Sequence, residues 1–490
     1  MQEIKIEDLT LQLKQLVAQK SVKAVRELEE EYTYADFAEA IEALDVYEQI
    51  YIFRVLRADE AAEVFSYLED DTKTKLAIAF SEDSGIKILD ELQTDELADV
   101  LEELPANITR KILEQTSQEK RDKINSILAY NDEQVGSIMS VDLSVIKSHW
   151  TAKKAISKIR ADYNKNKEIV HNFYVVDQND VLLGDITLEE LVFSNENEVV
   201  ENLFSVVVSV HPFDDKELAA QVFSDQDRST LPVVNKDNHL IGMITSDDVI
   251  DVIQEEATED MYKMAGINPE AAEDNYLKTT VLSIVKSRVL WLIILMISAT
   301  MSQFIIQQFT DLSNSVIDEI GITISSAIIV SLIPIISGSA GNAGSQSSTT
   351  VTRAAALGEI DKKDIKKVIW KEVSVGSIIG FIMFLINVIR LYLYFAIPYF
   401  RTDTSGAIPK IIPWKELSFV IIASSISLFI VVVFAKFLGT VIPLAAIKFK
   451  KDPAVMSAPI LTTLSDAIST LIFFGLNIGV LQLAHSVGWL

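Results

Sequence analysis

VLWLIILMIS, residues 289–298, opens a run of 22 residues, Val289–Thr310, that contains no charged side chain. The hydrocarbon core of a bilayer is about 30 Å thick, and a helix of about 20 mostly apolar residues crosses it. Four more apolar stretches follow this run, at Ile320–Thr352, Val373–Phe400, Leu417–Ile447 and Pro453–Leu490. Together they predict a membrane domain of five helices over residues 279–490.

Basic residues between these stretches indicate the direction of the spans. Six Lys and Arg follow the second stretch and three follow the fourth, whereas the segment after the first, residues 307–321, has none and is expected to be a loop. Basic loops stay on the cytoplasmic side. The loop after the third stretch conflicts mildly with this rule, because it would lie outside yet contains Arg401, Lys410 and Lys415. We therefore expect a multi-pass protein of the plasma (cell inner) membrane, in contact with its lipids, with a cytoplasmic N-terminus and an extracellular C-terminus.

Charge is divided unevenly along the chain. The 16 basic and 11 acidic residues from Thr279 onward give a net charge of +5, which leaves 27 basic and 59 acidic residues, a net −32, before it. Such an acidic region excludes nucleic acid as a partner and concentrates cations, although solubility alone would also explain it. The chain has no cysteine and five histidines, which argues against Zn or Cu sites. It has no P-loop, so we predict no ATP hydrolysis and no enzyme.

Two internal repeats organise the acidic half. DEAAEVFSYL, at residues 59–68, recurs as DELADVLEEL at residues 95–104, with apolar side chains at helical spacing. This predicts a superhelix of stacked helices over residues 1–132. In the second repeat, FYVVD (173–177) and GDIT (184–187) recur at one constant offset as LPVVN (231–235) and GMIT (242–245).

The second repeat predicts two α/β modules, at residues 133–196 and 197–253. Thr187 and Thr245 would each cap a helix, with Glu190 and Asp248 completing capping boxes. The pair resembles tandem CBS modules, which implies a site for ATP or another adenine nucleotide near Thr187, Thr245 and Asp248. Helix capping alone is the alternative explanation of these residues.

Asp466 lies inside the last apolar stretch, in APILTTLSDAISTLIFF (458–474). A charge at the bilayer centre costs about 2.5–3.5 kcal/mol even on the lenient scale. Threonine and serine share its helical face, so a hydrogen bond between helices is the alternative to a cation site. We favour the cation site. One carboxylate per chain offers few ligands to a divalent cation. A twofold homodimer with two Asp466 side chains across its axis would make a better site.

The second stretch ends in GSAGNAGSQSSTT, residues 338–350. Small residues let helices pack closely, yet Asn342 and Gln346 lie four apart on one face and favour a pore lining. We expect Gly338, Gly341 and Gly344 to open the backbone and expose carbonyls, which membranes accept where a water cavity is lined. Carboxylate, amide, hydroxyl and carbonyl oxygens are the ligands of hard cations such as Mg²⁺.

Two motifs carry a resemblance that covers nearly the whole chain. GNAGSQS (341–347) with RAAALGE (353–359), and DPA (452–454) with TLSD (463–466), resemble the signatures of MgtE-type magnesium transporters and channels. The resemblance implies a multi-domain membrane protein: an α-helical superhelical N domain, tandem α/β CBS modules, a connecting helix at 254–278 (Gln254–Tyr276) and a five-span homodimeric pore. It also implies that Asp466 binds the ion, beside Thr462 and the backbone at Ala458. The sequence departs from the pattern at Ala458 and Ser345.

The same resemblance implies that cytoplasmic Mg²⁺ bridges acidic surfaces and holds the dimer closed. The residues expected to bind it are Asp95, Asp99, Asp215, Glu217, Asp227, Asp248, Asp251, Glu256, Glu259 and Asp260. The expected function is passive import of hydrated Mg²⁺, with a second copy of the chain as the only protein partner. A broader Co²⁺, Mn²⁺ or Ca²⁺ transporter and a non-conducting CBS-based membrane sensor are the alternatives.

Overall fold

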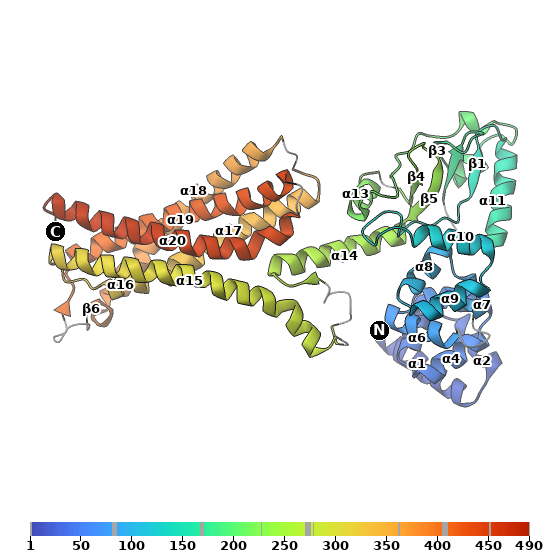
Figure 1. The fold of residues 1–490 in the computed structure, drawn as a ribbon, viewed down its shortest axis with the longest axis horizontal. Helices are drawn as coiled ribbons and strands as arrows, with labels where there is room; N and C mark the ends of the chain where they lie inside the picture. Colours follow the sequence, from blue (N-terminus) through green and yellow to red (C-terminus); the bar gives the residue numbers. More distant parts are fainter. Residues whose placement is uncertain are drawn as a thin grey trace. The chain divides into compact units, whose positions relative to one another are not determined.

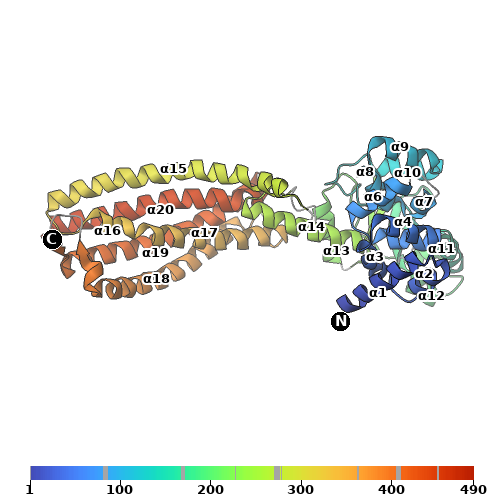
Figure 2. The same cartoon turned by 90° about the horizontal axis from the view of Figure 1, so that it is seen from below.

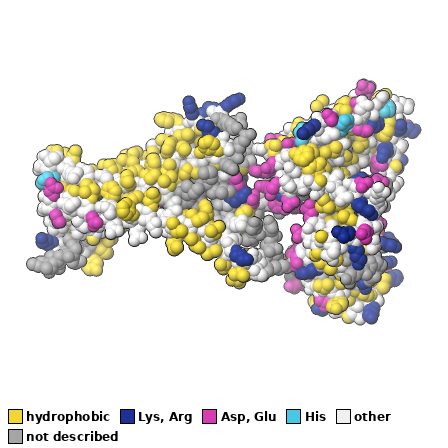
Figure 3. Space-filling model, in the orientation of Figure 1, with side chains coloured by type: hydrophobic (Ala, Val, Ile, Leu, Met, Phe, Trp, Pro, Cys, Tyr) yellow, Lys and Arg dark blue, Asp and Glu magenta, His cyan; other side chains and the backbone are white. Residues whose placement is uncertain are grey.

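The computed structural model describes residues 2–80, 86–166, 171–226, 228–269, 276–277, 279–360, 363–403, 410–449 and 452–489. The chain divides into two compact units, Met1–Ile253 and Gln254–Leu490 (Figure 1). Figure 3 shows hydrophobic side chains covering the long helices of the second unit, while acidic side chains gather along α14.

The first unit begins with a series of short helices. These are α1 (Gln2–Ala18), α2 (Val22–Glu29), α3 (Tyr34–Glu42), α4 (Val46–Val55), α5 (Ala58–Ser66), α6 (Asp70–Phe80), α7 (Ile86–Glu91), α8 (Thr94–Glu102), α9 (Ala106–Gln115) and α10 (Gln118–Ile127). Their apolar faces form one core, in which Phe53, Phe65 and Phe80 contact one another.

The first sequence repeat is visible in the geometry of α5 and α8. The Glu60 carboxylate accepts from the backbone N–H of Arg57 at the start of α5, and that of Glu96 accepts from Gln93 at the start of α8. Each bond satisfies an N–H that a helix leaves unpaired at its first turn. The predicted helical N domain is confirmed.

The two α/β modules follow in the same unit. Their elements are β1 (Val145–Lys147), α11 (Ala152–Asn166), β2 (Asn172–Val176), β3 (Leu182–Thr187), α12 (Leu188–Phe193), η1 (Val200–Asn202), α13 (Lys216–Gln226), β4 (Thr230–Val234), β5 (Leu240–Thr245) and α14 (Ser246–Ala265). β2 pairs antiparallel with β3, and β4 with β5. The register shift at Val175/Val176 recurs at the corresponding position of the second module, Val233/Val234. The predicted repeat is therefore a repeat of structure, down to one irregularity.

Among the described residues of the second unit, five helical segments are long and apolar enough to cross a membrane, as predicted, and α16 and α17 together form one of them. The elements are α15 (Val281–Ile320), α16 (Ser326–Ser331), α17 (Ile333–Ala356), α18 (Ile365–Ala396), η3 (Pro398–Arg401), β6 (Thr402–Asp403), β7 (Lys410–Ile411), α19 (Trp414–Lys448) and α20 (Pro453–Ser486). The long helices run side by side (Figure 2). α19 packs against α17, α18 and α20, and it buries more of its length than the others.

Three expectations were wrong. Residues 307–320 are not a loop, because α15 continues through them for 40 residues and ends only at Gly321, whose φ of 72° stops the helix. At about 1.5 Å per residue, α15 is about 60 Å long and exceeds the hydrocarbon core. The connecting helix does not run over Gln254–Tyr276. It begins at Ser246 as part of the second module and ends at Ala265, before Gly266 with a φ of 70°.

The expected opening of the backbone at Gly338, Gly341 and Gly344 is also wrong. α17 is a continuous helix from Ile333 to Ala356. Gly344 serves close packing instead, because a Cβ placed on Gly439 of α19 would lie 2.2 Å from the Gly344 carbonyl oxygen. Small residues permit this approach between membrane helices.

Candidate ion-conducting and regulatory sites

Asp466 lies on α20 and is partly buried. Its Oδ1 accepts a hydrogen bond of 2.5 Å from the Ser337 hydroxyl on α17. The alternative explanation of this carboxylate, a bond between helices, is thus present in the structure. It engages one of about four acceptor positions, so the carboxylate can still hold a hydrated cation.

Polar residues occupy an outward face of α17 near this carboxylate's partner. Gly338, Asn342 and Gln346 are exposed, whereas Ser347 and Ser348 are buried on the opposite side of the helix. Exposed amides at membrane depth require water or another protein surface. This face therefore suits the lining of an aqueous path. Thr462 on α20 is also exposed, and the side chain of Ala458 lies outside the described residues.

In the first unit, Asp95 and Asp99 of α8 lie near Asp248 in the first turn of α14. Desolvation by burial, together with repulsion, raises the pKa of Asp95 and of Asp248 to about 7. Asp99 lies at the exposed edge of this group, and its pKa is raised in the same direction by desolvation and by the charge of Asp95. The repulsion comes mainly from Glu96 on Asp95, and from Asp95 on the other two. One carboxylate oxygen of Asp95 is buried and has no hydrogen-bond partner among the residues that the structure describes. Excess negative charge and an unsatisfied acceptor are what a cation would relieve.

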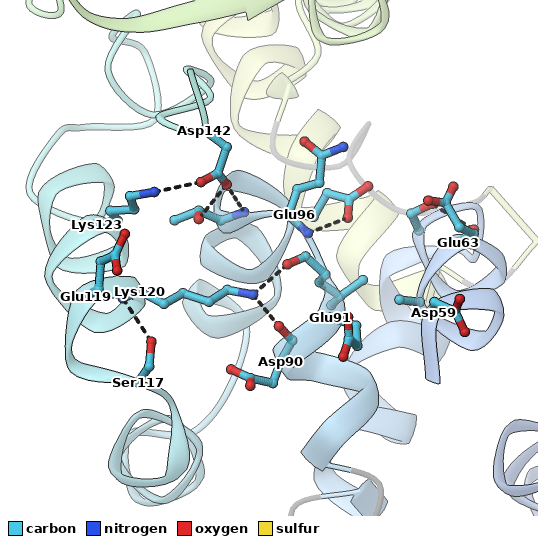
Figure 4. A pocket seen from close by; sticks show the side chains of 15 residues that line it. Asp59, Glu63, Asp90, Glu91, Glu96, Ser117, Glu119, Lys120, Lys123 and Asp142 are labelled. Atoms are coloured by element: carbon cyan, nitrogen blue, oxygen red, sulfur yellow. Dashed lines mark hydrogen bonds and ion pairs between the residues drawn. The ribbon is translucent and has the colours of Figure 1, made fainter. Parts of the chain in front are cut away.

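Asp142 joins the N domain to the first module, a contact that sequence reasoning missed. It accepts from the backbone N–H and hydroxyl of Thr94, at 3.2 and 2.7 Å, and from Lys123 at 2.8 Å. Burial alone would raise the pKa of Asp142, but these bonds outweigh it and lower the pKa. Figure 4 shows Asp142 at the edge of a pocket of about 370 Å³ whose wall includes Asp59 and Glu63.

The end of α14 forms a second acidic group, within the second unit. The Lys263 ammonium lies 2.7 Å from carboxylate oxygens of both Glu259 and Asp452. Burial and the nearby charge of Asp452 raise the pKa of Asp260. Lys263 therefore pairs with two carboxylates and acts on a third, Asp260, only through its charge. The pair of Lys263 with Glu259 has the i,i+4 spacing of one helix and could be read from the sequence, whereas the contact with Asp452 joins segments that are far apart along the chain.

The remaining predicted regulatory residues are spread out. Asp215 accepts from the backbone N–H of Glu217 and so caps the start of α13, while Asp251 and Glu256 lie along α14. Asp227 lies outside the described residues. Among the residues that are described, no group of three or more His, Asp or Glu side chains is arranged to hold a metal ion.

Thr187 caps the start of α12, as predicted, and Thr245 takes the corresponding place directly before α14. The Thr187 hydroxyl accepts from the backbone N–H of Glu190, whose carboxylate accepts from Thr187. Asp248 accepts from both the backbone and the hydroxyl of Thr245. Helix capping, the alternative to nucleotide binding, therefore engages all of these side chains.

The strands that lead to these caps meet a polar junction between the modules. Tyr174 of the first module donates to Thr230 of the second at 2.8 Å, and Arg228 pairs with the buried Asp185. The other Asp185 carboxylate oxygen is buried, and no described residue forms a hydrogen bond with it. Thr245 is the cross-strand neighbour of Thr230, so it lies close to this junction.

Comparisons with known proteins agree with this architecture. Family profiles match residues 32–133 (MgtE intracellular N domain), 135–195 and 201–255 (CBS domain), and 333–476 (MgtE, divalent cation transporter). The chain is 31% identical to the magnesium transporter MgtE of Enterococcus faecalis over 361 residues, which are 73% of this chain and 71% of that protein. It is 27% identical to MgtE of Bacillus subtilis, with 90% and 93% covered.

A crystal structure of the cytosolic domain of the Mg²⁺ channel MgtE in complex with ATP also matches, at 25% identity and a TM-score of 0.45, over 50% of this chain and 99% of that one. The family rests on the sequence relatives and on the matched domains. This chain, a multi-pass membrane protein with cytosolic N-terminal domains and not an enzyme, belongs to the MgtE family of magnesium transporters.

Proposed function

We propose that this chain forms a passive path that imports hydrated Mg²⁺ across the plasma membrane and is closed by cytoplasmic Mg²⁺. One observation carries the proposal: the Asp466 carboxylate lies within an apolar helix and contacts α17 through Ser337, beside the exposed polar face of that helix. A carboxylate at this depth is costly unless a cation or water meets it. The relatives named above are magnesium transporters.

A homodimer completes the path. In one chain, Asn342 and Gln346 face outward, where lipid would leave their amides unsatisfied. A second copy related by a twofold axis would enclose this face and bring two Asp466 side chains together. Because Mg²⁺ gives up its water reluctantly, the pair would hold the ion through its hydration shell.

Membrane potential is sufficient to drive this import. Each elementary charge gains about 2.3 kcal/mol per 100 mV, and a divalent ion gains about twice that. The direction of the spans, with an extracellular C-terminus, follows from the basic loops. Co²⁺, Mn²⁺ and Ca²⁺ use the same oxygen ligands, so a broader divalent transporter is the second candidate. The intramembrane carboxylate disfavours a non-conducting sensor.

Regulation by Mg²⁺ is supported by the acidic groups of the cytoplasmic half. Asp95 repels both Asp99 and Asp248, and a divalent ion among them would replace repulsion with attraction. Glu259 and Asp260 form a second such group, in which Lys263 already supplies one positive charge. Ion binding would then hold the cytoplasmic domains together and stop conduction.

Nucleotide binding by the CBS pair is a further proposal, with ATP as the probe. The unsatisfied Asp185 oxygen and the polar junction around Tyr174 and Thr230 offer acceptors and donors between the modules. Thr187, Thr245 and Asp248 would face the nucleotide at this junction. An MgtE relative was crystallised with ATP in its cytosolic domain.

The Asp466→Asn variant tests conduction. Removing the charge should lower Mg²⁺ uptake into proteoliposomes, under a fixed inside-negative potential, by at least about tenfold, because the amide attracts a divalent ion far less. Asp311→Asn on the exposed face of α15 is the matched control and should conduct like wild type. Wild-type uptake by Asp466→Asn would contradict the pore assignment.

Protease sensitivity of the full-length protein tests gating. Cleavage of the cytoplasmic half should slow as Mg²⁺ rises into the millimolar range, because the ion joins acidic surfaces. Asp248→Asn should shift the half-protecting concentration upward by about tenfold, or about 1.4 kcal/mol of binding. The exposed turn variant Asp237→Asn should leave it unchanged. Cleavage that ignores Mg²⁺ would refute the sensor.

The raised pKa values make the stability of the cytoplasmic domains depend on pH. The folded chain keeps Asp95 and Asp248 protonated up to about pH 7, whereas the unfolded chain ionises them near pH 4. The free energy of unfolding therefore falls as pH rises through this window, when no divalent ion is present.

In EDTA, we expect the cytoplasmic domains to melt at a higher temperature at pH 5.5 than at pH 8, by calorimetry. Mg²⁺ should raise the melting temperature more at pH 8, where it meets ionised carboxylates. Asp95→Asn should reduce both differences. Equal melting at the two pH values, with no Mg²⁺ effect, would rule out this linkage.

Calorimetric titration of the full-length protein with ATP tests the nucleotide proposal. Thr245→Val should weaken binding by roughly tenfold, because it removes a hydroxyl next to the module junction. Ser157→Ala, which removes a hydroxyl that donates within α11, is the control. Absence of ATP binding by the wild-type protein would remove nucleotide from the description.

A further inference from the structure

Three helices of the membrane unit meet at a polar triad in which two side chains are buried and the third is partly buried. It consists of Ser347 on α17, Glu372 on α18 and Lys436 on α19. The Ser347 hydroxyl donates to a Glu372 carboxylate oxygen at 2.6 Å, and the Lys436 ammonium lies 3.1 Å from Ser347 and 3.7 Å from that oxygen. Ser347 and Lys436 are 1% and 4% exposed. Neither charge has a role in the proposed conduction described so far.

Glycines close the space around Lys436. A Cβ on Gly376 of α18 would lie 3.3 Å from the Lys436 Cδ, and Gly439 touches the backbone of Gly344 on α17. Lysines near helix ends extend their ammonium groups to the interface. Lys436 lies 12 residues, or about 18 Å, before the end of α19 at Lys448, and its ammonium turns inward to the Ser347 hydroxyl. Its charge must therefore be balanced within the bundle.

The charge also matters to the ion. Ser347 is ten residues along α17 from Ser337, the partner of Asp466, which corresponds to about 15 Å. At that separation and an effective dielectric constant of about 20, one uncompensated positive charge would lower the occupancy of a divalent cation by roughly tenfold to fortyfold. An ion that moves along α17 toward its basic end would also pass the level of Lys436.

We propose that Glu372 is a charge-balancing residue for cation passage. Its carboxylate neutralises Lys436, and Ser347 holds both groups at α17, so that the negative potential of Asp466 acts on the ion without opposition. This inference rests on the proposed conduction of Mg²⁺. It assigns a transport role to a pair that lies on the helices packed behind the conducting face.

The test is Mg²⁺ uptake by full-length protein in proteoliposomes at a fixed potential, with the melting temperature of each variant measured alongside. Glu372→Gln leaves Lys436 unbalanced and should lower uptake at least about tenfold. Lys436→Met leaves a carboxylate and should conduct as well as wild type or better. Glu372→Gln combined with Lys436→Met is neutral and should return to within about twofold of wild type.

The pattern separates charge from packing. Hydrophobic replacement of both members of a buried ion pair is often tolerated, whereas removal of one partner is not. If the pair served only to hold the helices, uptake would follow the melting temperature, and the double variant would be no better than Glu372→Gln. That result overturns the proposal, as does a folded Lys436→Met variant with reduced uptake.

Two further variant comparisons keep the test decisive if Glu372→Gln does not fold. Should Glu372→Gln fail to fold, the ratio of uptake by Lys436→Met to that by the double variant still decides, because the proposal requires it to be one or more. Lys436→Arg keeps the charge and should conduct within about twofold of wild type. If wild type itself carries no Mg²⁺, the proposed conduction fails; if wild type conducts and the double variant is not rescued, this inference alone fails.

Discussion

The contact between Gly344 and Gly439 is the constraint on which the membrane unit depends. It brings the backbones of α17 and α19 so close that no side chain fits between them. Close approach places α19 at the centre of the bundle, where it also meets α18 and α20. The position of α17 in turn presents Ser337 to Asp466 on one side and Ser347 to Glu372 and Lys436 on another. Small residues thus fix where the polar groups can be.

Charge in a poorly polarisable environment recurs in both units. The cytoplasmic carboxylates of Asp95, Asp99 and Asp248 are crowded and partly desolvated, and these effects on Asp99 exceed the attraction of nearby Lys73. In the membrane unit, the buried Lys436 is paired with the partly buried Glu372. The cytoplasmic carboxylates are arranged so that a dissolved cation would stabilise them, whereas Glu372 is already neutralised by the ammonium of Lys436. The same electrostatic cost is therefore met in two ways within one chain.

Sequence predicted the features that local pattern controls. Apolar length located the five spans, and identity at fixed offsets located the helical repeats and both modules, including the cap at Thr187. It could not place the end of α15, because residues 307–320 are polar enough for a loop yet pack as helix through Ser313 and Val316. Nor could it pair Glu372 with Lys436 or Lys263 with Asp452, since those contacts depend on how distant helices meet. The sequence suggested that the glycines of α17 open its backbone, because a flexible segment and a closely packed helix are both rich in glycine and other small residues.

The two modules differ at one acidic position that follows the second strand of each repeat. In the first copy, Glu190 completes the cap of Thr187; in the second copy, Asp248 holds Thr245 in the corresponding place. Asp248 also comes within electrostatic reach of Asp95 in the helical domain. Asp248 thus combines a contact at the start of its own helix with an electrostatic influence from the helical domain. A duplicated module can in this way keep its local geometry while one copy becomes sensitive to the charge of a neighbouring domain.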